Sequence, residues 1–161
     1  MQLVRASEQH EDDLRSFACT AREARFGVQD IERDVRSGKA LRRSFQHPED
    51  RFALIYIGGD LAACAYHQPW PGFGVEARFL MFVALHDQYQ GSLMLDRGCS
   101  LASHVIGLIA DDVRDCDPTA VVLGGHVHAD NERCMRLLDA QGWQEDPLVG
   151  GYVRRTILLY P

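Results

Sequence analysis

The nine residues "ARFLMFVAL", at 77–85, form a nearly unbroken apolar run. A strand without polar alternation is typical of burial on both faces, so we expect it at the centre of a sheet. Leu101 to Val113 follows with the spacing of an amphipathic helix, and "AVVLGGHVH" at 120–128 has the pattern of another strand. This order predicts two neighbouring parallel strands joined by a crossing helix.

The flanking sequence predicts additional helices and antiparallel strands. A short strand at 3–6 precedes a helix capped by Ser7, and a charged helix pair is expected from about 28 to 45. The glycines of "GGD" accept the positive φ of a tight turn, which predicts a hairpin at about 51–68. A helix from Asn131 ends at Gly142, and "YVRRTILLY" closes the chain as a strand. We expect one mixed α/β domain over residues 1–161.

Composition limits the partners and the compartment. Seventeen basic and 23 acidic residues give a net charge of −6, which is the wrong sign for nucleic-acid binding. The five cysteines are odd in number and include no C-x-x-C pair, so we expect neither disulfides nor a zinc ribbon. This cysteine content is typical of a protein of the reducing cytoplasm, where we expect the chain to reside. No uncharged apolar run approaches ~18 residues, and the first residues lack an apolar signal core, so no membrane segment is expected.

The joint "DQYQGSLMLDRGCSLAS", at 87–103, lies between the apolar strand and the helix. The first amides of a helix are unpaired and favour a phosphate, particularly beside glycine and small residues. A helix entered at Leu93 would have about 22 residues, whereas one entered near Gly98 would have about 17, a more usual length. We therefore favour the later start, with a lengthened loop at about 87–97.

Two segments carry a resemblance to a known family. "FVALHDQYQGS" resembles a central strand followed by "V-x-P-x-[YF]-[QR]-G", and "VHADNERCMRLLDAQGW" resembles "V-x-x-x-N-x-x-A-x-x-L-Y-x-x-x-G-F". Both motifs belong to the GNAT N-acetyltransferases, and the resemblance covers about 79–143. It implies a GNAT-like fold that binds acetyl-CoA as cosubstrate, with the pantetheine arm between splayed strands at 77–85 and 120–128. The implied cofactor-binding residues are Val83, Leu85, Gln90, Gly91, Ser92, Arg97, Gly98, Ser100 and Asn131.

The family's pyrophosphate signature, [QR]-x-x-G-x-[GA], has no clean register in this chain. It can start at Gln88, Gln90 or Arg97, and each start places a leucine or a serine where the family has a small residue or a glycine. We favour a cradle formed by amides around Gly98 to Ser100, with Gln90 to Ser92 nearby. The alternative is a packed loop without a ligand.

Catalytic candidates are less clear, because Met81 and Leu138 stand where many relatives carry a glutamate and a tyrosine. Transfer of an acetyl group to an amine needs a base, an oxyanion donor and an acid. His126, His67 and Glu76 are the substitutes, although each equally fits a purely structural or solvated position. His126 and His128 share one strand face, but no third ligand is evident and no metal is expected.

The sequence leaves three functions open. The first is acetyl transfer to a primary amine of a small molecule or peptide. The second is a non-catalytic acyl-CoA-binding or interaction module, and the third is a toxin-type enzyme that acetylates charged tRNA, which the acidic composition disfavours. Pairing through a terminal strand to form a homodimer also stays open.

Overall fold

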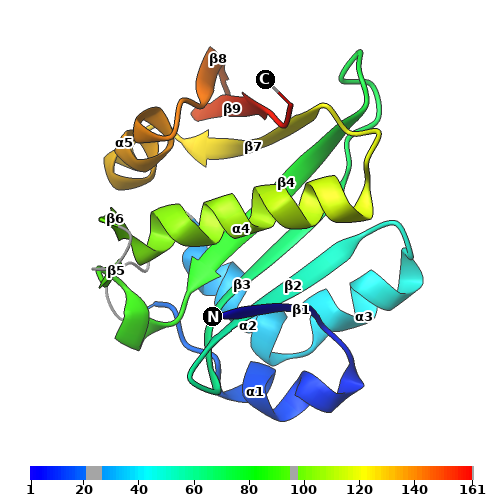
Figure 1. Cartoon of the computed structure of the whole chain (residues 1–161), viewed down its shortest axis with the longest axis vertical. Helices are drawn as coiled ribbons and strands as arrows, with labels where there is room; N and C mark the ends of the chain where they lie inside the picture. Colours follow the sequence, from blue (N-terminus) through cyan, green and yellow to red (C-terminus); the bar gives the residue numbers. More distant parts are fainter. Residues whose placement is uncertain (21–26, 95–97, 161) are drawn as a thin grey trace.

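A seven-stranded mixed sheet forms the centre of the molecule (Figure 1). The computed structural model describes residues 1–20, 27–94 and 98–160, without the side chains of 147–149. Only β4 and β7 pair in parallel; the other neighbouring strands of the sheet are antiparallel. In order across the sheet, the strands are β1 (Gln2–Arg5), β2 (Arg51–Ile57), β3 (Asp60–Pro69), β4 (Ala77–Leu85), β7 (Val122–His128), β9 (Tyr152–Leu158) and β8 (Gln144–Val149).

Helices cover both faces of this sheet, which confirms the predicted mixed α/β class (Figure 1). One hydrophobic cluster packs α4 (Leu101–Cys116) and α5 (Glu132–Ala140) against one face. A second cluster on the opposite face includes side chains from α1 (Glu11–Ser16), α2 (Val28–Arg36) and α3 (Lys39–Gln46), which follow the 3-10 turn η1 (Glu8–His10). Within the described ranges, no helix combines the length and apolar character that crossing a membrane requires.

Most predicted elements are confirmed within a residue or two, and three features were missed. The hairpin turn contains Gly58 and Gly59 at φ 62° and 99°, and α5 is capped by Asn131 and followed by Gly142 at φ 78°. The sequence pattern did not predict β8, whose charged residues and Pro147 are typical of an edge strand. It also missed η2 (Asp87–Tyr89) and a small hairpin of β5 (Leu93–Met94) with β6 (Cys99–Ser100).

The prediction that 77–85 is buried on both faces is wrong in its middle. Met81 is 41% exposed. In the pairing with β3, Phe82 lies opposite Tyr66 and Leu80 opposite His67, so Met81 has no partner and forms a β-bulge. A bulge disturbs the alternation of the side chains and twists the strand locally, which a sequence pattern of period two does not anticipate.

A buried ionic network joins β3 and β4 to α4. His67 is 0% exposed, and its Nε2 donates to Asp112 Oδ2 at 3.1 Å. Its Nδ1 accepts from Arg78 Nε at 2.9 Å, which places the ring proton on Nε2 because arginine does not deprotonate. Arg51 binds Asp112 through two hydrogen bonds, of 2.8 and 3.2 Å, and Arg78 reaches Asp117 at 3.2 Å. The network therefore ties the helix to the sheet beneath it.

Burial and charge set the protonation of this network. Burial lowers the pKa of His67, and its hydrogen bond to Asp112 does not offset that effect. Burial also raises the pKa of Asp112, but the hydrogen bonds from His67 and Arg51 outweigh it, and the net pKa is lowered. The folded protein thus holds a neutral imidazole between an ionised carboxylate and two guanidinium groups.

Removing the central carboxylate should destabilise the fold strongly. Asp112→Ala leaves the buried His67 and Arg51 without their acceptor, and we expect a loss of about 3–5 kcal/mol in the free energy of unfolding. Asp111→Ala is the matched control, since this neighbour forms an exposed ion pair with Arg114 and should cost less than about 1 kcal/mol. Urea denaturation measures both, and equal losses would contradict a structural network.

Stability should also decrease in mild acid. Since the folded pKa of His67 is below the unfolded value of about 6.5, the unfolded chain binds a proton first as the pH falls. The free energy of unfolding should therefore drop between pH 7 and 5, and His67→Gln should make that drop shallower by up to about 1.4 kcal/mol per pH unit. Denaturation curves across this range test it; parallel pH profiles for the two proteins would count against the assignment.

Candidate active site

The strands β4 and β7 pair over a short stretch and then diverge. Ala77–Leu80 lies opposite Val122–Gly125, and the pairing ends there although β4 continues to Leu85 and β7 to His128. Figure 1 shows the two strands separating toward the side on which α4 begins. The splay predicted from the family resemblance is therefore confirmed.

Two glycines allow the close packing at the point where the strands part. A Cβ on Gly125 would lie 2.9 Å from the Leu80 carbonyl oxygen of β4. A Cβ on Gly124 would lie 2.5 Å from the indole ring of Trp70, so this ring rests directly on the β7 backbone. A larger residue at either position would push the strand or the indole away.

Aromatic rings gather on the sheet face opposite α4, around His126. The Trp70 ring lies 4.5 Å from Phe73 and 4.9 Å from Phe79, between ring centroids. The His126 ring meets Phe79 edge-on at 5.1 Å and Trp70 at 6.0 Å. His126 is exposed, and none of the described residues hydrogen-bonds to its side chain. An imidazole placed in this way can exchange a proton with a bound molecule.

The other two catalytic candidates lie apart from His126. His67 belongs to the buried network on the α4 side of the sheet, and at 0% exposure it has no route to a substrate. Glu76 is exposed just before β4, and its carbonyl oxygen accepts from the Val121 amide at 2.8 Å. The structure thus brings neither His67 nor Glu76 into contact with His126.

One group of side chains has the composition of a metal site without its chemistry. Ligand atoms of His67, Asp112 and Cys116 lie within 4.8 Å of one another. However, His67 Nδ1 and the Asp112 carboxylate are already bound by Arg78 and Arg51. A metal ion there would displace or face two permanent cations, so we assign the group to the ionic network.

The helix α4 begins at Leu101, which confirms the later of the two predicted starts. Ser100 is its N-cap, and the Ser100 hydroxyl accepts from the Ser103 amide at 3.1 Å. The Leu101 amide donates to the Ser92 carbonyl at 2.9 Å. Among the described residues, the amide of Ala102 has no partner, so one donor of the first helical turn stays available.

The hairpin of β5 and β6 explains why the signature has no linear register. Leu93 pairs with Ser100 and Met94 with Cys99, and the Leu101 amide binds the Ser92 carbonyl, so the start of α4 lies beside the residue that precedes the hairpin. The segment that ends at Ser92 therefore meets the start of α4 at Leu101 in space. In the signature, Gln90 can thus take the first position in place of Arg97, with the same serine, Ser100, in the glycine position as in the linear register from Arg97.

The remaining predicted cofactor residues are placed as follows. Gln90 Nε2 donates to the carbonyl oxygens of Cys19 and Leu85, at 2.8 and 3.1 Å, so its amide group ties loops together. Gly91 and Gly98 have φ of 81° and 63°, Val83 and Leu85 pack against the α4 cluster, and Asn131 Oδ1 accepts from the Cys134 amide at 3.1 Å. Arg97 lies outside the described residues.

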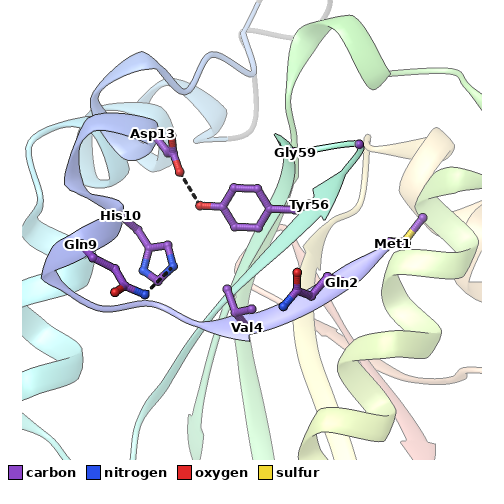
Figure 2. Close-up of a pocket in the computed structure, with 9 residues that line it drawn as sticks. Met1, Gln2, Val4, Gln9, His10, Asp13, Tyr56 and Gly59 are labelled. Carbon is purple, nitrogen blue, oxygen red and sulfur yellow. Dashed lines mark hydrogen bonds between the residues drawn. The ribbon is translucent and has the colours of Figure 1, made fainter.

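A separate hollow of about 670 Å³ lies near the outer strands β1 and β2 (Figure 2). Tyr56 projects into it and donates from its hydroxyl to Asp13 Oδ2 at 2.6 Å. Burial and this carboxylate raise the pKa of Tyr56, so the phenol stays protonated. The hollow contains none of the predicted site residues and is not part of the splay.

Comparison with known proteins finds relatives by structure only. No protein-family model and no curated protein sequence matches the chain. The ribosomal-protein-alanine N-acetyltransferase from Brucella melitensis matches with a TM-score of 0.69 and 14% identity, covering 98% of this chain and 99% of that one. The PaiA N-acetyltransferase from Thermoplasma acidophilum, solved with coenzyme A, has a TM-score of 0.68 and 12% identity over 98% of each chain.

A third match is a chimeric spermidine N-acetyltransferase from Vibrio cholerae. Its TM-score is 0.67 at 12% identity, with coverage of 99% of this chain and 96% of that one. Agreement over nearly the whole of each chain at such low identity is agreement of fold. This chain is therefore a divergent protein with the fold of the GNAT N-acetyltransferases.

Proposed function

We propose that the protein transfers the acetyl group of acetyl-CoA to a primary amine of a small molecule or peptide. The proposal rests on one observation: three features that suit acetyl transfer lie at the same place in the structure. The β-bulge at Met81, the end of the β4–β7 pairing and the exposed His126 all lie at the apex of the splay. A bulge turns backbone groups out of the ladder, so this apex combines main-chain hydrogen-bonding groups with a titratable side chain.

The residues around the splay fit acetyl-CoA in two respects. Val83 and Leu85 of β4, with Val127 of β7, provide apolar walls for a flexible thioester arm. The first turn of α4, with its free Ala102 amide and positive dipole end, suits a pyrophosphate. The bound thioester would supply an activated acyl group; binding it and moving the amine's proton are the tasks of the protein.

In this proposal, His126 takes the proton from the attacking amine. Its ring is held edge-on by Phe79 and Trp70 and is open to solvent on the remaining side. A backbone amide at the Met81 bulge would donate to the oxygen that becomes negative during attack. Neither Met81 nor the buried Leu138 offers a proton, so the departing thiolate would be protonated by water.

Acetyl-CoA should raise the Tm of the protein, and a negative charge introduced at the start of α4 should abolish that increase. At 100 times Kd, one bound ligand adds about 2.7 kcal/mol, or roughly 5–10 °C in Tm. Ala102→Glu places a carboxylate in the first helical turn, where it suits the dipole but repels a pyrophosphate, so we expect the shift to vanish. Gly107→Glu, an exposed site two turns along α4, is the matched control and should retain it. An unchanged shift in Ala102→Glu would show that phosphates bind elsewhere.

Replacing His126 should slow the transfer of the acetyl group without weakening acetyl-CoA binding. We expect His126→Ala to lower kcat about 10²- to 10⁴-fold, the contribution of a positioned general base. Release of free thiol across pH 5.5–9 measures this effect. His47→Gln, at an exposed histidine after α3, is the control. A full rate in His126→Ala would exclude the histidine as the base.

A second candidate is a non-catalytic acyl-CoA-binding module. Leu138, at the position of the family's acidic tyrosine, is only 5% exposed and packs in the core. Binding of acetyl-CoA without thiol release across amines, amino acids and peptides would favour the module.

A further inference from the structure

The neighbouring strand β9 places an arginine directly opposite His126. Arg154 pairs with His126 in the antiparallel register of β7 and β9. Directly opposite residues project from the same face of a sheet, with Cβ atoms about 4.5–5.5 Å apart. The base of the proposed reaction and a permanent cation are therefore neighbours at the apex of the splay.

Contacts on two sides orient Arg154. Its Nε donates to Asp146 Oδ2 at 2.8 Å, and its guanidinium carbon lies 5.4 Å from the centroid of the Phe73 ring. Among the described residues, no partner binds its two terminal nitrogens, and the side chain is 42% exposed. A guanidinium held by one edge and one face presents its remaining N–H groups to a planar anion such as a carboxylate.

Two side chains that are neighbours on one sheet face can bind both polar groups of an α-amino acid. In an α-amino acid the amine and the carboxylate are separated by one carbon, so both can be bound by adjacent side chains at once. Phe79, Trp70 and Phe73 form an apolar wall beside them. An acceptor without a carboxylate would leave the terminal N–H groups of Arg154 without an acceptor, since Asp146 binds only its Nε.

We propose that the acceptor is a free α-amino acid with an apolar or aromatic side chain, whose carboxylate binds Arg154 while its amine faces His126. This inference rests on the proposed acetyl transfer. The amine nitrogen forms a bond to the acetyl carbon, the carbon–sulfur bond breaks, and His126 takes the ammonium proton. The products are the N-acetyl amino acid and CoA, whose thiolate is protonated by water.

Pairs of acceptors that differ only in the carboxylate test this inference. Each of the standard amino acids is compared with the amine formed from it by decarboxylation, for example phenylalanine with phenethylamine. Spermidine serves as a cationic acceptor without a carboxylate. We expect kcat/KM to favour the amino acid about 10- to 100-fold, as for a charge-assisted hydrogen bond. A preference for the amines or for spermidine would overturn the inference.

Variants of Arg154 test whether its guanidinium causes the preference for the amino acid over the amine. Arg154→Gln should bring the ratio of kcat/KM for phenylalanine over phenethylamine close to one, chiefly by raising KM for the amino acid; Arg154→Lys should restore part of the preference. Arg15→Gln, on exposed α1, is the control for loss of a surface arginine. A preference that persists in Arg154→Gln would overturn the assignment.

Calorimetry with acetyl-CoA separates the two levels of the argument. If the wild-type protein binds acetyl-CoA and acetylates only amines that lack a carboxylate, or acetylates no amino acid, the amino-acid inference fails and the acetyl-CoA site stands. If acetyl-CoA does not bind, the proposed function fails as well, and with it the inference.

Discussion

The short parallel contact between β4 and β7 is the constraint on which the rest of the candidate site depends. Gly124 and Gly125 bring β7 close to Leu80 and to Trp70, and the pairing ends at that point. Because the strands then part, the apolar residues of β4 beyond Met81 face a splay that the sheet does not close. The bulge, the exposed imidazole and the aromatic wall are all arranged around this end of the pairing.

The helix α4 must be held firmly for its first turn to meet that splay. Its C-terminal half is attached by Asp112, which binds Arg51 and His67, while its N-terminal end is joined to the loop through Leu101 and Ser92. His67, a catalytic candidate by sequence, therefore has a structural role. The proposed base is instead His126, an exposed histidine on the opposite face, and none of the described residues hydrogen-bonds to its side chain.

Sequence periodicity predicted the elements that bury a regular apolar pattern, and it failed where regularity is broken. The run at 77–85 and the helix from Leu101 were predicted closely, because burial dictates their composition. The bulge at Met81 and the edge strand β8 were missed, since the former depends on the partner strand and the latter carries charges and Pro147. Of the site, His126 was anticipated, but the positions of Trp70 and Arg154 beside it were not.

By itself, the sequence determined the mixed α/β class, the parallel strand–helix–strand unit and the likeness to the acetyltransferase core, because apolar spacing and short motifs are local properties. Only the tertiary structure decided which side chains meet. It separated His67 from His126 by the thickness of the sheet, placed Arg154 opposite His126 through strand pairing, and joined Ser92 to Leu101 across an inserted hairpin. These are contacts between distant residues, and their register is set by packing that no linear pattern records.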